Sequence, residues 1–380
     1  MKTTRVSTAL AAVPLALLLL ALAFPFAGVP DEPQDPPLHA LHWWSGALPV
    51  AAWLVLAAAA AGGLRRGDRG WRLALASAAA LAGAWLLAAL PPATGDAPAD
   101  TGFWLAGAAV VLLALAGIRR VAAIEGGRLQ AGAAAALFGL WVLTLWQLGV
   151  SAFDVPRVLL PSPLQIAASF DGQGATLAGD FVQTVVKAVW VGWLVGSGGG
   201  FLVGVAIDRV PFLQRGLLPV ASLTSTIPLV GVAPIAVMWF GFDWPSKAAV
   251  VALMTFFPML VSTLAGLKSA GRLERELMHS YAAGYGRTLL WLRLPAALPF
   301  LFGALKVNAT LALIGAIVAE FFGSPTRGLG FRISTEAARM NMPLVWAAIV
   351  VAAVTGSLAF ALLVQLERRV AFWHPSVRGR

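Results

Sequence analysis

The chain has 380 residues, of which 59% are hydrophobic and 12% are charged. Because soluble domains carry about 25% charged residues, this composition excludes a soluble protein. A membrane-spanning helix needs about 20 apolar residues, so the chain has material for about ten spans and little for a large domain outside the membrane. The net charge of +10 does not indicate a nucleic-acid partner, because Lys and Arg gather in the cytoplasmic loops of membrane proteins. With no cysteine in the chain, disulfides and cysteine-ligated metals are excluded.

Apolar stretches long enough to cross the hydrocarbon core follow one another along the chain. Each stretch predicts a helix, because a helix satisfies its backbone polar groups internally. We therefore predict an all-α polytopic membrane protein with about ten transmembrane helices. Their expected ranges are 6–29, 43–64, 73–90, 102–118, 131–150, 181–207, 217–240, 247–266, 297–321 and 343–366.

The loops between these stretches alternate between basic and acidic. One side, with the termini included, carries 20 Lys and Arg against 6 Asp and Glu, whereas the other side carries 4 against 10. Since basic loops stay in the cytoplasm, both termini are expected to be cytoplasmic. Residues 1–23 also fit a secretory signal that ends in Ala21-Leu22-Ala23. The apolar run continues to Val29, which favours an uncleaved helix, and cleavage would leave the later helices in the same orientation.

The chain divides into two regions of different character. Residues 1–130 hold about four Ala- and Leu-rich spans without a recognisable motif, and we interpret them as an N-terminal extension. From residue 131 onward, proline, glycine and polar residues enter the spans, so function is expected there. One span has glycine at every fourth position, which predicts close packing against another helix or, alternatively, a moving or substrate-lining surface. These glycines are Gly192, Gly196, Gly200 and Gly204.

Polar residues within the later spans are candidates for a translocation pathway. Hydroxyl side chains precede Pro228, and a helix broken at membrane depth is tolerated only against protein or a cavity. A kinked helix whose hydroxyls bond to the preceding turn is the alternative. Lys306 must face the bundle interior, water or a partner, unless it extends to the cytoplasmic edge. The pathway candidates are Thr224, Ser225, Thr226, Lys306, Asn308 and Glu320.

The longest cytoplasmic connection covers residues 267–296 and joins the eighth and ninth spans. Leu273, Leu277 and Tyr281 share one helical face, with charged residues between them. A second short helix is expected around Leu289–Leu294, ended by the proline that follows. Two amphipathic helices at the membrane surface would form a docking platform for a soluble protein, and binding to lipid alone is the alternative.

A motif with a defined spacing runs through this loop. Glu276-Leu277-Met278 is followed after three residues by Ala282, and after nine more by Leu292-Arg293-Leu294-Pro295. This spacing resembles the Glu-Ala-Ala, Gly and Ile-x-Leu-Pro motif of permease subunits of ABC importers. Ala282 stands where that family has glycine, and because a left-handed turn strains alanine, Gly284 or Gly286 could take over the bend. The resemblance implies that contact with the ATPase involves Glu276, Leu277, Met278, Tyr281, Ala282, Gly284, Leu292, Leu294 and Pro295.

Further likenesses narrow the resemblance to the nitrate, sulfonate and taurine branch, which includes pyrimidine-precursor and riboflavin importers. They are Leu160-Pro161-Ser162-Pro163, Pro234-Ile235, Trp239-Phe240-Gly241, Phe256-Phe257-Pro258 and Gly328-Leu329-Gly330. The resemblance covers about residues 131–375 and implies a six-helix type I ABC importer permease core in the bacterial inner membrane.

The same resemblance implies the partners. They are two ATP-binding subunits that hold ATP and Mg, a periplasmic solute-binding protein, and a second permease copy, identical or homologous, in membrane lipid. It implies no catalytic residue, metal or cofactor in this chain, and the solute stays open between a nitrate-, sulfonate- or taurine-like anion and a pyrimidine- or riboflavin-like compound. An ion-coupled secondary transporter is the alternative, although no inverted repeat is visible. An intramembrane enzyme would need His, Asp or Ser clustered in facing spans.

Overall fold

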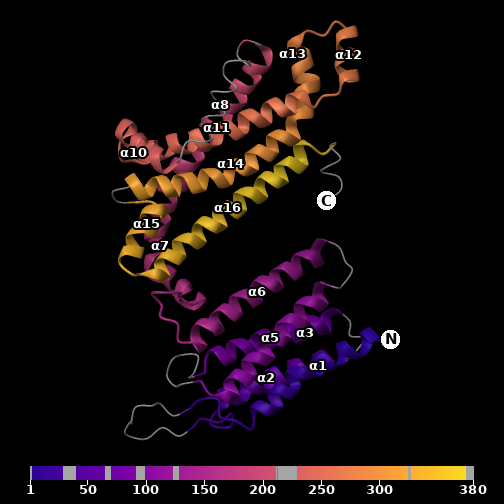
Figure 1. Ribbon diagram of the computed structural model, residues 1–380, viewed down its shortest axis with the longest axis vertical. Coiled ribbons are helices and arrows are strands. Elements are labelled where there is room, and N and C mark those ends of the chain that lie inside the picture. The colour runs from indigo at the N-terminus through magenta and orange to yellow at the C-terminus, as the bar shows by residue number, and fades with distance from the viewer. Residues whose placement is uncertain are drawn as a thin grey trace. The chain divides into compact units, whose positions relative to one another are not determined.

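The computed structural model describes residues 2–28, 40–64, 70–90, 99–122, 128–210, 212, 229–323 and 327–373. Every regular element within these segments is a helix (Figure 1), which confirms the all-α prediction. The only bridges among the described residues are isolated ones, from Ala27 to Leu41 and to Ala99. The chain forms two compact units, Met1–Ile166 and Ala167–Arg380, which we call unit 1 and unit 2.

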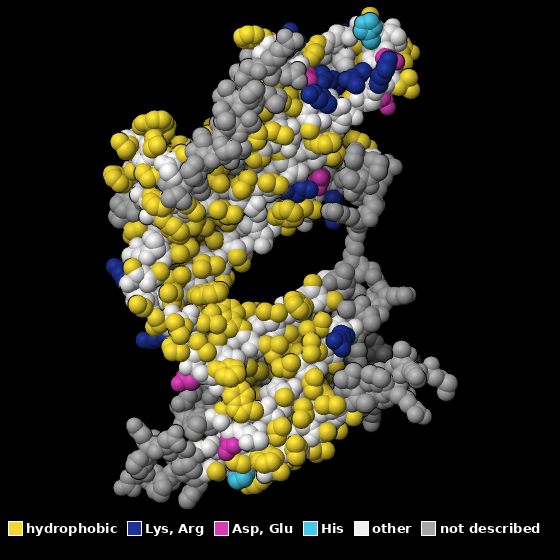
Figure 2. Space-filling view, viewed as in Figure 1, with side chains coloured by type: hydrophobic (Ala, Val, Ile, Leu, Met, Phe, Trp, Pro, Cys, Tyr) yellow, Lys and Arg dark blue, Asp and Glu magenta, His cyan; other side chains and the backbone are white. Residues whose placement is uncertain are grey.

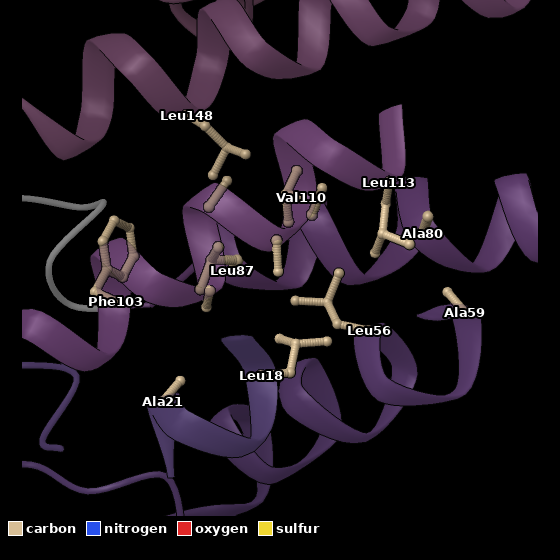
Figure 3. Close-up of a cluster of buried hydrophobic side chains, with 14 of the residues drawn as sticks. Leu18, Ala21, Leu56, Ala59, Ala80, Leu87, Phe103, Val110, Leu113 and Leu148 are labelled. Atoms are coloured by element: carbon tan, nitrogen blue, oxygen red, sulfur yellow. The ribbon is translucent and has the colours of Figure 1, made fainter. Parts of the chain in front are cut away.

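Unit 1 is a bundle with an Ala- and Leu-rich core. Its described helices are α1 (Lys2–Ala21), α2 (Ala47–Leu64), α3 (Gly70–Ala88), α5 (Thr101–Ala122) and α6 (Arg128–Ala152). Leu18, Leu56 and Leu87 lie in the core that these helices bury (Figure 3). Helix α6, predicted to be the first helix of the permease core, packs on α3 and α5. The change of function at residue 130 stays a prediction, since by contacts the boundary follows Ile166.

Unit 2 is organised around α11. Helix α7 (Pro163–Phe181) begins in the last residues of unit 1 and continues through the π-helical segment η1 (Val182–Val189) into α8 (Trp190–Arg209). The other main helices of unit 2 are α10 (Leu229–Phe240), α11 (Trp244–Lys268), α14 (Leu294–Gly323), α15 (Leu329–Ala338) and α16 (Met342–Val370). Helix α11 packs on both α8 and α14, and α16 packs on α14 and α15. The short helices α12 (Arg272–Ser280) and α13 (Tyr285–Thr288) and the π-helical segment η2 (Leu289–Arg293) connect α11 to α14 at one end of the unit (Figure 1).

Six helical segments among the described residues are long and apolar enough to cross a membrane. They are Thr101–Arg119, Gly132–Ala152, Pro163–Arg209, Trp244–Lys268, Tyr285–Gly323 and Met342–Val370. Four shorter apolar helices lie in the remaining predicted ranges, at Ala12–Ala21, Ala47–Gly62, Ala76–Ala88 and Gly231–Phe240. By length and composition these helices fit a multi-span membrane protein, whereas the count of ten spans stays a prediction.

Two predicted boundaries differ from the structure. The helix expected to start at residue 181 starts at Pro163, because Ser162 and Gln165 form a capping box: the Ser162 N–H lies 3.0 Å from Gln165 Oε1. At the other site, Pro295 does not end a helix. It lies inside the continuous helical segment Tyr285–Gly323, directly after the π-helical turn η2, whose wider hydrogen-bonding pattern accommodates the missing N–H of proline.

The four-residue glycine repeat of α8 faces α11. Gly192, Gly196, Gly200 and Gly204 are all buried. A Cβ at Gly196 would lie 2.1 Å from Thr255 Oγ1 and 2.3 Å from the carbonyl oxygen of Ala252, both on α11. A Cβ at Gly200 would lie 2.3 Å from the carbonyl oxygen of Phe256. The backbones of α8 and α11 therefore approach at a distance that only glycine permits.

We expect Gly196→Ala to separate α8 from α11, because the added Cβ overlaps backbone atoms that cannot rotate away. Overpacking of this kind costs about 1–3 kcal/mol of the free energy of unfolding. Gly198→Ala on the same helix is the matched control, since a Cβ at Gly198 meets nothing within 4 Å. Thermal unfolding of the two purified variants in detergent measures the difference, and equal stability would contradict this account of the packing.

Candidate functional site

Helix α12 presents an apolar face that no part of the described chain covers. None of its residues is buried, and Leu273 and Tyr281 are 77% and 79% exposed. Leu273, Glu274, Glu276, Leu277 and Ser280 line a shallow groove of about 480 Å³ on its surface. Lys and Arg side chains gather at this end of unit 2 (Figure 2). An exposed apolar groove bordered by charges is typical of a surface that binds another protein.

Glu276, the first residue of the sequence motif, takes part in an exposed ion pair. Its Oε1 lies 2.7 Å from Nε of Arg272, one turn earlier on α12, and 58% of its side chain is exposed. Exposed pairs of this type contribute little to stability. Its carboxylate is therefore available to a partner at low cost.

The bend after α12 lies at the position where the sequence motif predicts it. Ala282 has φ 53°, so it adopts the left-handed conformation, whereas Gly284 has φ −68° and does not take over the bend. The Ala282 N–H donates to the carbonyl of His279 at 2.9 Å, and the Ala283 N–H donates to that of Met278 at 3.0 Å. These two bonds form a Schellman motif, which normally ends in glycine.

Ala282→Gly should stabilise this loop, because glycine adopts a positive φ without the cost of about 1 kcal/mol that alanine bears. Ala282→Val should destabilise it, since a β-branched side chain is more strained at this φ. Protection of the α12 amides from hydrogen exchange, compared between the two variants, measures the effect. Greater protection with valine than with glycine would contradict the assignment of the bend.

The remaining motif residues anchor the loop to the helices. Leu294 packs on the hydrophobic cluster that includes Leu267 and Ala297, and Leu292 and Pro295 are half-buried. The motif thus has an exposed half on α12 and an anchored half at the start of α14. This division suits a segment that contacts a partner on one side and moves a helix on the other.

A polar cluster that the sequence did not predict joins the anchored half to α8. The two terminal nitrogens of Arg293 each lie 2.7 Å from a carboxylate oxygen of Asp208, near the end of α8. The hydroxyl of Tyr285 lies 3.2 Å from Asp208 Oδ2, and Arg293 Nε lies 3.0 Å from the carbonyl oxygen of Leu267. We call Asp208, Tyr285 and Arg293 the clamp.

A second polar cluster holds the start of α15, at the other end of α14. Glu320 is buried near the end of α14; its Oε1 accepts the hydroxyl of Thr184 at 2.7 Å, and its Oε2 accepts the N–H of Gly330 at 2.7 Å. Thr184 Oγ1 accepts the N–H of Leu329 at 2.8 Å. The backbone N–H groups at the start of α15 are thereby satisfied by side chains of η1 and α14.

Asp180 and Arg332 complete this second cluster. Asp180 Oδ1 accepts the N–H of Gly328 at 2.9 Å, and Asp180 Oδ2 accepts Arg332 Nε at 2.8 Å. The hydrogen bond with Asp180 raises the pKa of the Arg332 guanidinium further, so Arg332 stays protonated. Gly328 has φ 137°, and a Cβ there would lie 2.5 Å from the carboxyl carbon of Glu320. This close approach explains why Gly328-Leu329-Gly330 has glycine at its first position.

The pathway candidates lie in different surroundings. Thr224, Ser225 and Thr226 are outside the described residues. Lys306 pairs with Glu367 of α16 at 2.8 Å, so this lysine has a partner, one of the alternatives we considered. Asn308 is fully buried, and its Nδ2 donates to Ser197 Oγ at 2.9 Å and to the carbonyl of Thr255 at 2.7 Å, which joins α14 to α8 and α11. A pathway role for these residues stays a prediction.

Apolar helices long enough to cross a membrane and an exposed amphipathic helix, α12, are the features that this site combines. The described residues contain no group of three or more His, Asp or Glu that could hold a metal ion. Helix α12 is amphipathic and has no buried residue.

Comparison with known proteins identifies the family to which the chain belongs. Residues 196–372 match the binding-protein-dependent transport system inner membrane component family. The formylaminopyrimidine transport permease protein ThiX of Halalkalibacterium halodurans is 31% identical over 62% of this chain and 94% of its own length. The riboflavin transport system permease protein RibX of Chloroflexus aurantiacus is 30% identical over 62% and 88%. The taurine transport system permease protein TauC of Escherichia coli is 28% identical over 66% and 91%.

The chain belongs to the family of inner-membrane permease components of binding-protein-dependent ABC importers, in the nitrate, sulfonate and taurine branch. It is a transport permease subunit and not a catalytic one. This result confirms the resemblance to ABC importer permeases found in the loop of residues 267–296, and nothing in the comparisons favours an ion-coupled secondary transporter.

Proposed function

We propose that this permease works with two ATP-binding subunits, a second permease copy and a periplasmic solute-binding protein, and that α12 is its coupling helix. One observation carries the proposal: the residues that begin the family's motif, Glu276-Leu277-Met278, lie on an exposed amphipathic helix with no buried residue. The family is by its description binding-protein-dependent, which supports the solute-binding partner. ATP and Mg bind to the ATP-binding subunits, so this chain needs no cofactor of its own.

The distribution of charge in unit 2 supports a cytoplasmic C-terminus, and the alternation of basic and acidic loops along the sequence supports a cytoplasmic N-terminus. The α12 end of unit 2 carries the basic residues of the coupling loop, whereas Asp180, Asp243 and Glu336 lie near the opposite ends of the helices. Positive residues remain on the cytoplasmic side of membrane proteins. In this orientation α12 faces the ATP-binding subunits and the start of α15 faces the periplasm.

Helix α14 is the mechanical connection in this proposal. The segment Tyr285–Gly323 is helical over 39 residues, which corresponds to roughly 58 Å at 1.5 Å per residue. It begins in the coupling loop, and Glu320 near its end holds the first N–H groups of α15. Closure of the ATP-binding subunits would displace α12, tilt α14 as a rigid body, and move α15 at the outer side. The permease performs no covalent step, and the driving free energy comes from the different contacts of the two states.

The solute is in this proposal a small nitrogen heterocycle of the pyrimidine or flavin kind. Two of the relatives that share 30% or more identity carry the names of a formylaminopyrimidine and a riboflavin permease. Lys306, the lysine that would suit an anion, is neutralised by Glu367 at 2.8 Å. An anionic solute would have to compete with that carboxylate.

Uptake into vesicles tests the proposed function. The permease is reconstituted with its ATP-binding subunits and its solute-binding protein, and uptake of a labelled formylaminopyrimidine, riboflavin and taurine is compared. We expect ATP-dependent uptake of a heterocycle that requires the binding protein and persists when ion gradients are collapsed. Uptake of taurine alone would contradict the solute class, and uptake driven by an ion gradient without ATP would contradict the mechanism.

A further inference from the structure

One arginine ties the base of the coupling loop to two transmembrane helices. The guanidinium of Arg293 binds both carboxylate oxygens of Asp208 at 2.7 Å and also donates from Nε to the carbonyl of Leu267 at 3.0 Å. Asp208 lies near the end of α8, and Leu267 near the end of α11. Three N–H groups of a planar fork are thus satisfied at once, which restrains both distance and angle.

Tyr285 adds a second link to the same carboxylate. Its hydroxyl lies 3.2 Å from Asp208 Oδ2, and the guanidinium of Arg209 lies 5.4 Å from the centre of its ring. Only 13% of the Arg293 side chain and 7% of the Asp208 side chain are exposed. Separating a partly desolvated ion pair would leave each charge without its partner, which costs free energy. The clamp therefore resists a movement of the loop relative to the helices.

We propose that Asp208, Tyr285 and Arg293 are positioning residues that transmit movement of the coupling loop to α8 and α11. The proposal rests on the proposed function of α12 as the coupling helix. Helix α12 has no buried residue of its own, so a push on it would be absorbed by the loop unless the base of the loop is fixed to the helices. The clamp provides that attachment. The glycine face of α8 packs closely on α11, so that the two helices would move together.

The clamp predicts uncoupling when it is broken, and not loss of the partner. In the reconstituted complex, Asp208→Asn and Arg293→Gln should each retain the ATP-binding subunits and ATP hydrolysis, because the exposed face of α12 is untouched. The amount of solute moved per ATP hydrolysed should fall by at least about tenfold, as expected from losing one partner of a desolvated charge pair. Arg369→Gln, at an exposed arginine of α16 outside the clamp, should keep the wild-type ratio.

The cysteine-free chain permits a reversible test within one sample. The double variant Asp208→Cys, Arg293→Cys should be uncoupled, and a short bifunctional thiol reagent that joins the two positions should restore the ratio of transport to ATP hydrolysis. A wild-type ratio in the single variants, joint loss of the ATP-binding subunits and transport, or no recovery after confirmed cross-linking would each overturn the proposal. Failure of the wild-type chain to bind ATP-binding subunits would instead reject the proposed function itself.

Discussion

Glu276→Lys is expected to reduce coupled transport by at least about tenfold. In the proposed docking of α12, the reversed charge faces the groove of the ATP-binding subunit, and the partner of Glu276 in that groove is left desolvated and unpaired. The loss of one partner of such a charge pair costs about 2–5 kcal/mol. Folding should be unaffected, since Glu276 is exposed and its pair with Arg272 lies at the surface. Solute uptake and solute-stimulated ATP hydrolysis in vesicles containing all subunits measure the effect.

The matched control for this variant is Asp171→Lys, the same charge reversal at an exposed carboxylate of α7. It should transport normally. Wild-type transport by Glu276→Lys, alone and together with Glu274→Lys, would show that α12 is not the coupling element.

Glu320→Ala is expected to have the largest effect on stability. Its carboxylate is buried and accepts hydrogen bonds from Thr184 and Gly330, so alanine leaves these two donors without their acceptor and creates a cavity. A buried donor that loses its acceptor costs about 1–3 kcal/mol of the free energy of unfolding, and the cavity adds to this cost. Thermal unfolding in detergent measures the loss, and transport should fall with it because α15 is released from α14.

Glu320→Gln is the informative companion variant. Glutamine keeps the shape and one acceptor oxygen, so the loss should be clearly smaller than with alanine. If alanine and glutamine variants were both as stable as the wild-type protein, the second polar cluster would not be what holds α15.

The two short helices between α11 and α14, which we propose as the coupling loop, could be predicted from the sequence because the motif is local. The motif left the bend open between Ala282 and the glycines at 284 and 286, and φ 53° places it at Ala282, where the family has glycine. The face formed by Leu273 and Leu277 could likewise be predicted, because residues four apart share one side of a helix.

The polar clusters could not be predicted, because their members are far apart in the chain. Arg293 occupies the variable position of the motif, and its partner Asp208 lies 85 residues earlier. The sequence shows Glu320 as a charge inside a span, but its partner Thr184 lies 136 residues before it and on another helix. Sequence spacing within one helix could exclude a pair with Lys306 but could not supply the partners on other helices.

Two boundary predictions failed for local reasons that were present in the sequence. The capping box of Ser162 and Gln165 marks the start of α7, whereas hydropathy alone detects only the apolar residues of a helix and not its capping residues. Pro295 does not end a helix, because the π-helical turn η2 just before it lets the helix continue through a residue without an N–H.

Site-specific photocross-linking tests the central claim, that α12 docks on the ATP-binding subunit, most directly. The chain contains no cysteine, so Leu277→Cys can be labelled at one position with a thiol-reactive photoprobe, and Met340→Cys, next to α15 at the other side of unit 2, serves as the matched control. The two residues are similarly exposed, at 57% and 64%. In the assembled transporter, the account predicts a covalent product with the ATP-binding subunit from position 277 and none from position 340. A product from position 340, or the absence of one from position 277 in a complex that hydrolyses ATP, would contradict it.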